Sequence, residues 1–169
     1  MLILEDRRII EAPIERCFDL ARSVEVHLLG NIHYGEAALA VGGATSGLLG
    51  LGQQVTWRAR HFHIRFTLSS RVTAFDPPVY FQDTMLRGPF RSMRHDHFLR
   101  ALSPNRTEIH DRMFLEAPRG PVGRFAERLF LGRYMQALLR ERNAVIQRVA
   151  ESNEWRGYLP FVSEGKWLE

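Results

Sequence analysis

Residues 90–117, FRSMRHDHFLRALSPNRTEIHDRMFLEA, carry the pattern that decides the fold. Apolar and polar side chains alternate on both sides of Ser103-Pro104-Asn105, a turn-forming stretch, so two antiparallel strands are predicted over 90–102 and 107–117. Successive side chains of a strand point to opposite faces, and the face with fewer charges is expected to be buried. In the first strand that inner face carries Met93, His95, His97 and Leu99.

Turn positions predict which polar residues meet on this inner face. The inner face of the second strand carries Ile109, Asp111, Met113 and Leu115. The turn at Pro104-Asn105 sets Asp111 opposite His97 or Leu99. The turn at Gly88 likewise brings Asp83 beside Met93 or His95, on the face that also carries Phe81 and Met85. We therefore predict a polar cluster of two histidines and two carboxylates within an apolar wall.

The segments before and after this hairpin predict an α+β fold. Period-two segments at 31–40, 53–62, 64–75 and 79–87, with an opening strand over 2–12, give an antiparallel sheet of about seven strands. A short helix follows Pro13, and Ile14, Cys17, Phe18 and Ala21 form its buried stripe. Residues 122–150 predict a long C-terminal helix, whose apolar stripe changes phase near Gly132 and indicates a kink there.

With this order of elements, the chain resembles the START-like helix-grip (SRPBCC) superfamily from about residue 1 to 150. The stretches that carry the likeness, and that look like bacterial polyketide-cyclase-like or uncharacterised members, are APIERCF (12–18), VTWRARHF (55–62), residues 90–98 and GPVGR (120–124). The resemblance implies a curved sheet wrapped around the C-terminal helix, on a scaffold that hosts carriers and enzymes alike. We assign residues 1–151 to one ligand-binding domain. Residues 152–169, which are rich in aromatic side chains, are assigned to a C-terminal arm.

Composition narrows the class of protein. A chain of 169 residues with 45% hydrophobic and 25% charged residues is typical of one globular domain. It has no apolar run long enough to span a membrane, and charges at residues 5–8 leave no room for a signal-peptide core, so we expect a cytoplasmic protein without stable membrane insertion. Cys17 is the only cysteine, which excludes an intrachain disulfide.

The basic residues do not indicate a nucleic-acid partner. The formal charge is +4, and Lys166 is the only lysine among 23 basic residues. The arginines are dispersed and form no nucleic-acid-binding motif, so we expect no nucleic-acid partner.

The glycine-rich segment 42–52 is the first candidate functional motif. It lacks the Gly-Lys-Ser/Thr ending and the glycine spacing of phosphate loops. It is either a plain connection between strands or a gate whose Leu48, Leu49 and Leu51 cover a cavity mouth, and both interpretations stay open.

The His/Asp cluster has three interpretations. Its members could simply pair with one another beneath the helix, anchor the polar end of a ligand, or act as an acid–base pair. Two imidazoles and an aspartate also make three potential metal ligands, but the spacing alone is a weak signal, so we predict neither a metal nor a cofactor.

We therefore favour the binding of one small hydrophobic ligand, lipid-like or aromatic. The predicted binding residues are Trp57, His61, Phe81, Asp83, Met85, Met93, His95, His97, Asp111 and Met113. The alternative is an enzyme resembling polyketide cyclases and aromatases, with His95 or His97 and Asp111 as its acid–base pair. The sequence favours binding, since it shows no activated nucleophile or cofactor fingerprint. An interaction protein that uses the arm, and a homodimer, are further options.

Overall fold

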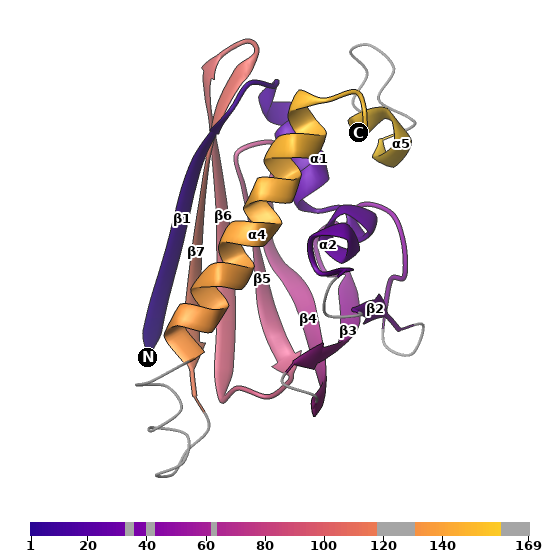
Figure 1. The fold of residues 1–169 in the computed structure, drawn as a ribbon, viewed down its shortest axis with the longest axis vertical. Helices are drawn as coiled ribbons and strands as arrows, with labels where there is room; N and C mark the ends of the chain where they lie inside the picture. Colours follow the sequence, from indigo (N-terminus) through magenta and orange to yellow (C-terminus); the bar gives the residue numbers. More distant parts are fainter. Residues whose placement is uncertain (33–35, 40–42, 62–63, 118–130, 160–169) are drawn as a thin grey trace.

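The computed structural model describes residues 1–32, 36–39, 43–61, 64–117 and 131–159, and these residues form the predicted α+β arrangement. The strands pair antiparallel in the order β1-β7-β6-β5-β4-β3-β2. Their bounds are β1 Leu2–Ile10, β2 Ala37–Ala38, β3 Gln54–His61, β4 Ile64–Asp76, β5 Tyr80–Arg87, β6 Ser92–Ser103 and β7 Arg106–Glu116. The sheet curves around helix α4 (Gly132–Glu151), and helices α1 (Ile14–Ala21) and α2 (Val24–Gly30) lie on the same side (Figure 1). The helix-grip fold is confirmed.

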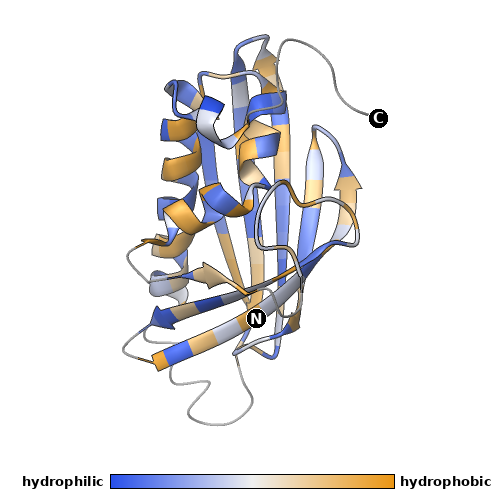
Figure 2. Ribbon diagram, turned by 90° about the vertical axis from the view of Figure 1, so that its right-hand side faces the viewer, coloured by the Kyte–Doolittle hydropathy of each residue, from blue (hydrophilic) through white to orange (hydrophobic). Residues whose placement is uncertain are grey.

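The register of the central strands follows the turn positions. Strands β6 and β7 pair His97 with Asp111, and β5 and β6 pair Asp83 with His95. Polar and apolar residues alternate as bands along the strands in Figure 2, as expected of a sheet with one buried face. The predicted inner face of β6 and β7 is therefore the face that the helices cover.

Helix α1 attaches the helical layer to the sheet. Pro13 precedes its first turn, and the ring of Phe18 packs against those of Phe75 and Phe81, with ring centroids 5.5 Å apart in both pairs. Cys17 is fully buried, and burial raises the pKa of its thiol to about 12. Cys17 is thus a core residue, as predicted.

Of the strand predicted at 31–40, the structure describes 31–32 and 36–39, and among these it forms a strand at Ala37–Ala38 alone. The side chain of Ser23 accepts a hydrogen bond from the Val26 backbone amide at 3.3 Å and caps α2, which runs to Gly30. The helix ends before Asn31, and among the described residues of the segment Ala37–Ala38 pair with β3, followed by a backbone hydrogen bond from Leu39 to Thr56 at 2.8 Å. The end of this helix at Gly30 and the short pairing at Ala37–Ala38 leave less strand here than the alternation of the segment predicts.

The C-terminal region is described from residue 131. Helix α4 begins at Gly132, so the predicted helix over 122–130 lies outside the described residues, and a kink near Gly132 is not tested. Beyond it, α5 (Trp155–Tyr158) starts the predicted arm: Arg16 stacks over Trp155 at 4.3 Å, and Leu159 is only 3% exposed. This part of the arm packs on the core, whereas 160–169 are not described.

The glycine-rich segment is tied to the helical layer. Gly43 has φ 149°, and a Cβ there would lie 2.1 Å from the Gln54 carbonyl oxygen, so the close approach of the two segments requires glycine. Leu49 donates its backbone amide to the Arg22 carbonyl at 3.0 Å and packs beside Val55 and Trp57. Leu51 is 64% exposed and does not line the cavity, so of the two open interpretations the gate is not supported at this position.

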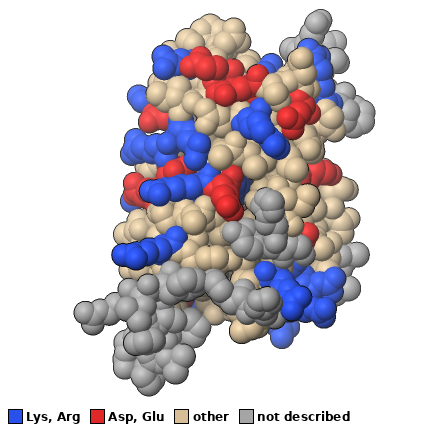
Figure 3. Space-filling model, viewed as in Figure 1, with Lys and Arg blue, Asp and Glu red and all other residues tan. Residues whose placement is uncertain are grey.

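The outer surface mixes charges of both signs. Basic and acidic side chains are interspersed along the face that carries α4 (Figure 3). Ion pairs such as Arg8–Asp6 at 3.1 Å and Arg148–Glu154 at 3.6 Å belong to this pattern. No helix within the described ranges combines the length and apolar character needed to cross a membrane.

Candidate functional site

A cavity of about 360 Å³ lies between the inner face of the sheet and the helices α2 and α4. Its wall is mainly apolar, and polar groups interrupt it at a few points. Seven of the predicted binding residues line it: Trp57, His61, Phe81, Asp83, Met93, His95 and Met113. The other three, Met85, His97 and Asp111, do not.

The polar residues of strands β5, β6 and β7 form what we call the sheet cluster: Asp83, His95, His97 and Asp111. His97 Nδ1 lies 2.8 Å from Asp111 Oδ1, and His97 Nε2 lies 3.2 Å from Asp83 Oδ1. His95 adds looser contacts, with Nδ1 3.9 Å from Asp83 Oδ1 and Nε2 3.6 Å from Asp111 Oδ2. Each histidine therefore lies between the same two carboxylates.

The electrostatics of the sheet cluster separate the two histidines. Burial, with the nearby charge of His97, lowers the pKa of His95 to about 4, so its imidazole is neutral at pH 7. Burial also opposes the charged form of His97, but attraction and hydrogen bonding from Asp111 and Asp83 outweigh it and raise the pKa of His97. Despite burial, the histidines hold the pKa of Asp111 well below its usual value.

The structure places His97 and Asp111 behind the cavity wall. The ring of His97 stacks between Phe81, at a centroid distance of 4.0 Å, and His95, at 3.8 Å, and both of those rings line the cavity. Asp111 lies behind the two histidines. Met85 packs instead into the apolar group that contains Met93. The sequence predicted the correct face of the sheet, but alternation alone does not distinguish side chains that reach the cavity from those behind its wall.

A second polar group, which we call the helix cluster, consists of His27, Asn31 and Glu36. His27 Nε2 lies 3.1 Å from Glu36 Oε2 and 3.1 Å from Asn31 Nδ2, and its ring stacks on Trp57 at 3.9 Å. Burial acts to raise the pKa of Glu36, but attraction to His27 lowers it. Sequence reasoning missed this cluster because it predicted a strand at 31–40. The spacing of His27 and Asn31, four residues apart on one helical face, was the available signal.

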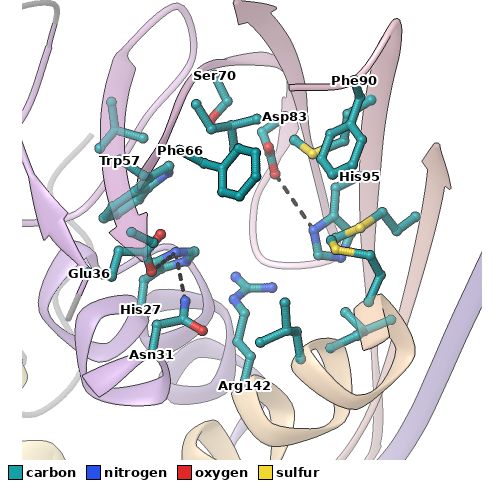
Figure 4. Close-up of a pocket in the computed structure, with 18 of the residues that line it drawn as sticks. His27, Asn31, Glu36, Trp57, Phe66, Ser70, Asp83, Phe90, His95 and Arg142 are labelled. Carbon is teal, nitrogen blue, oxygen red and sulfur yellow. Dashed lines mark hydrogen bonds and ion pairs between the residues drawn. The ribbon is translucent and has the colours of Figure 1, made fainter. Parts of the chain in front are cut away.

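Arg142 of α4 extends into the space between the two clusters (Figure 4). Its Nη2 donates to the Ala21 carbonyl at 2.7 Å, and its Nη1 lies 3.5 Å from Asp111 Oδ2. Within the described part of the chain, Nε and Nη1 have no hydrogen-bond partner. Its position on the apolar stripe, seven residues after Met135, could have revealed it.

The cavity therefore offers an apolar space with directed polar groups. Two buried guanidinium donors and the Nε2 atom of His95 lack hydrogen-bond partners among the described residues. Asp83, His95 and His97 also bring one potential metal-ligand atom each to within 4.8 Å of one another. These groups could hold a polar end of a ligand, or a cation, against the sheet.

Comparisons with known proteins support the fold. No protein-family model matches the sequence, and no curated protein matches it significantly. Among solved structures, TTHA0849 from Thermus thermophilus is 14% identical, with a TM-score of 0.67 over 88% of this chain and 99% of that chain. A START superfamily protein from Mycobacterium smegmatis is 10% identical, with a TM-score of 0.64 over 88% of this chain and 97% of that chain.

A third solved structure is also similar. Ara h 8.0201 is 13% identical, with a TM-score of 0.55 over 86% of this chain and 97% of that chain. At such low identities the likeness concerns the backbone arrangement and not the site. The chain has the helix-grip fold of the START-like and Ara h 8 structures.

Proposed function

We propose that this protein binds one small hydrophobic molecule, lipid-like or aromatic, in the cavity between the sheet and α4. The observation that carries the proposal is an apolar cavity of about 360 Å³ that contains buried Arg142 donors without hydrogen-bond partners among the described residues. Burial of apolar ligand surface supplies most of the affinity, at about 25 cal/mol per Å². An acceptor oxygen on the ligand would satisfy the guanidinium and fix the ligand's orientation.

The contents of the purified protein provide the first test. Native mass spectrometry, followed by solvent extraction, identifies any molecule that stays in the cavity. We expect one hydrophobic molecule per chain, with at least one acceptor oxygen. Polar, water-soluble contents would contradict the proposal.

A matched pair of probes tests the anchor. 2-Acetylnaphthalene and 2-isopropylnaphthalene have similar size, but only the first carries an acceptor oxygen. Arg142→Met is expected to weaken binding of the ketone about tenfold, as for loss of one hydrogen bond to a charged group, and binding of the hydrocarbon far less. Arg140→Met, on the exposed side of the same helix, is the control and should change neither affinity. Equal losses for both probes would rule out the anchoring role.

A cyclase- or dehydratase-like enzyme is the second candidate. It is favoured by one observation: His95 lines the cavity as a neutral imidazole whose Nε2 lies 3.6 Å from Asp111 Oδ2. His95 would be the group that touches substrate, and His97 and Asp111 would position it. Mass spectrometry of a linear poly-β-ketone thioester incubated with the protein would detect loss of water on cyclisation. Turnover that His95→Gln leaves unchanged would exclude this role.

A further inference from the structure

We propose that Asp83, His95 and His97 form a binding site for one divalent transition-metal ion of the zinc type, which opens into the cavity. This site goes beyond the binding of a hydrophobic ligand and does not depend on it. The spacing of these residues in the sequence is a weak signal, but in the fold their potential ligand atoms lie within 4.8 Å of one another.

The first step is the convergence of three ligand atoms. His97 Nε2 and His95 Nδ1 lie 3.2 Å and 3.9 Å from the same atom, Asp83 Oδ1. Ligand atoms about 2.1 Å from a tetrahedral zinc ion lie about 3.4 Å from each other. Two of the three separations bracket this value, and all three ligand atoms lie within 4.8 Å of one another, so the set would contract around a bound ion.

The second step is the orientation of the two imidazoles. Asp111 lies behind both rings, with Oδ1 2.8 Å from His97 Nδ1 and Oδ2 3.6 Å from His95 Nε2. Metal-bound histidines usually donate their other ring N–H to a carboxylate, which fixes the tautomer and the ring orientation. Here one carboxylate faces the rear nitrogens of both histidines, and the front nitrogens face Asp83.

The third step is the unsatisfied chemistry of the cluster. His95 Nε2 and Asp111 Oδ2 are buried and lack hydrogen-bond partners among the described residues, although they face each other. Coordination of a metal through Nδ1 puts the ring proton of His95 on Nε2, which faces Asp111 Oδ2 at 3.6 Å. Two carboxylates, Asp83 and Asp111, face the two imidazoles, and coordination of a metal ion would displace any proton that His97 carries.

The fourth step is access. Asp83 and His95 line the cavity, so the ion has an entry path, and its remaining coordination position would face the cavity. Two imidazoles and one carboxylate favour zinc, cobalt or iron over magnesium and calcium, which prefer oxygen ligands only. The helix cluster has a single imidazole and a single carboxylate, so it does not offer an equivalent set.

Cobalt titration of the chelator-treated, untagged protein tests the site. We expect one equivalent of Co²⁺ to bind and to give the strong visible absorption of a four- or five-coordinate ion, and Zn²⁺ to displace it. Asp83→Asn and His95→Gln should each weaken binding at least about tenfold, as for loss of a ligand. Asp111→Asn should weaken it by about 10–100-fold without changing the spectral shape, since Asp111 only positions the histidines.

Control variants separate this site from surface binding. His110→Gln removes a partly buried imidazole beside Glu5 on β7, outside the cavity, and His27→Gln removes the imidazole of the helix cluster. Both should leave Co²⁺ affinity unchanged. Circular dichroism of each metal-free variant confirms folding, and Asp83→Asn decides the outcome if His95→Gln does not fold. Failure to bind Co²⁺ or Zn²⁺ stoichiometrically, or binding that Asp83→Asn and His95→Gln leave unchanged, would overturn the proposal. The naphthalene probes, measured with chelator present, report on hydrophobic ligand binding separately.

Discussion

The two polar clusters of the cavity differ in how the chain holds them in place. The sheet cluster comes from directly paired positions on β5, β6 and β7, so the hydrogen-bond ladders fix its members relative to one another. The helix cluster combines His27 of the seven-residue helix α2 and Asn31 at its C-terminal end with Glu36, which lies beyond that helix. The contrast suggests that the sheet cluster contributes to stability as a single network, whereas the helix cluster contributes as separate local contacts.

Removal of Asp111 tests this contrast most strongly. Asp111→Ala takes the carboxylate away from both His97 and Arg142, and leaves buried positive charge without its partner. Breaking a buried pair in this way costs about 3–5 kcal/mol, so we expect a loss of that order in the free energy of unfolding. Urea denaturation with chelator present measures it.

Glu108→Ala is the matched control on the same strand. Glu108 pairs with Arg100 at 2.6 Å, but that arginine side chain is largely exposed. Exposed pairs contribute about 1 kcal/mol or less, so the control should lose far less stability. Equal losses from the two substitutions would show that the sheet cluster is not a buried network.

The same contrast explains how much of each cluster could be predicted from the sequence. Strand alternation and two short turns determine both the face and the register of Asp83, His95, His97 and Asp111, and the pairs Asp83–His95 and His97–Asp111 are among those predicted. The depth of each side chain within that face depends on stacking with Phe81, which no local pattern encodes. His97 was therefore placed on the correct face but one layer too close to the cavity.

The helix cluster and Arg142 illustrate what local patterns miss. His27 and Asn31 lie in and directly after a helix that Ser23 caps, and the strand predicted at 31–40 put Asn31 and Glu36 in a different element from His27. Arg142 lies on the apolar stripe of α4. The hydrophobic pattern explains why its neighbours on that stripe are apolar, but it does not explain an arginine there. Its contacts with Ala21 and Asp111 join elements that are far apart in the sequence, so only the folded chain reveals them.

The glycine-rich segment allows a comparison within one loop. Leu49 lines the cavity, whereas Leu51 is 64% exposed. Leu49→Ala should lower the free energy of unfolding by about 1–2 kcal/mol, less than for a fully buried leucine, because the side chain is half-buried. Leu51→Ala should change it by less than about 0.5 kcal/mol. Urea denaturation of both variants checks the difference, and equal effects would mean that Leu49 does not form part of the wall.

The smallest expected difference between the two clusters is in the pH dependence of stability. The pKa of Glu36 is lowered from its ordinary value of 4.5, so its carboxylate stabilises the fold fully above that value, and the contribution disappears as the pH falls through the folded-state pKa. Glu36→Gln should therefore cost up to about 1 kcal/mol at pH 7, and the variant and the parent should converge at acid pH.

Asp111→Asn provides the comparison for that pH profile. The pKa of Asp111 lies well below its ordinary value of 3.8, so the difference between this variant and the parent should persist to lower pH than the difference caused by Glu36→Gln. Urea denaturation from about pH 7 to about pH 3, with chelator present, gives both profiles. If the Glu36 difference outlasts the Asp111 difference on acidification, then the helix cluster holds its carboxylate more strongly than the sheet cluster does. That result would reverse the assignment of the paired strands as the more strongly coupled polar network.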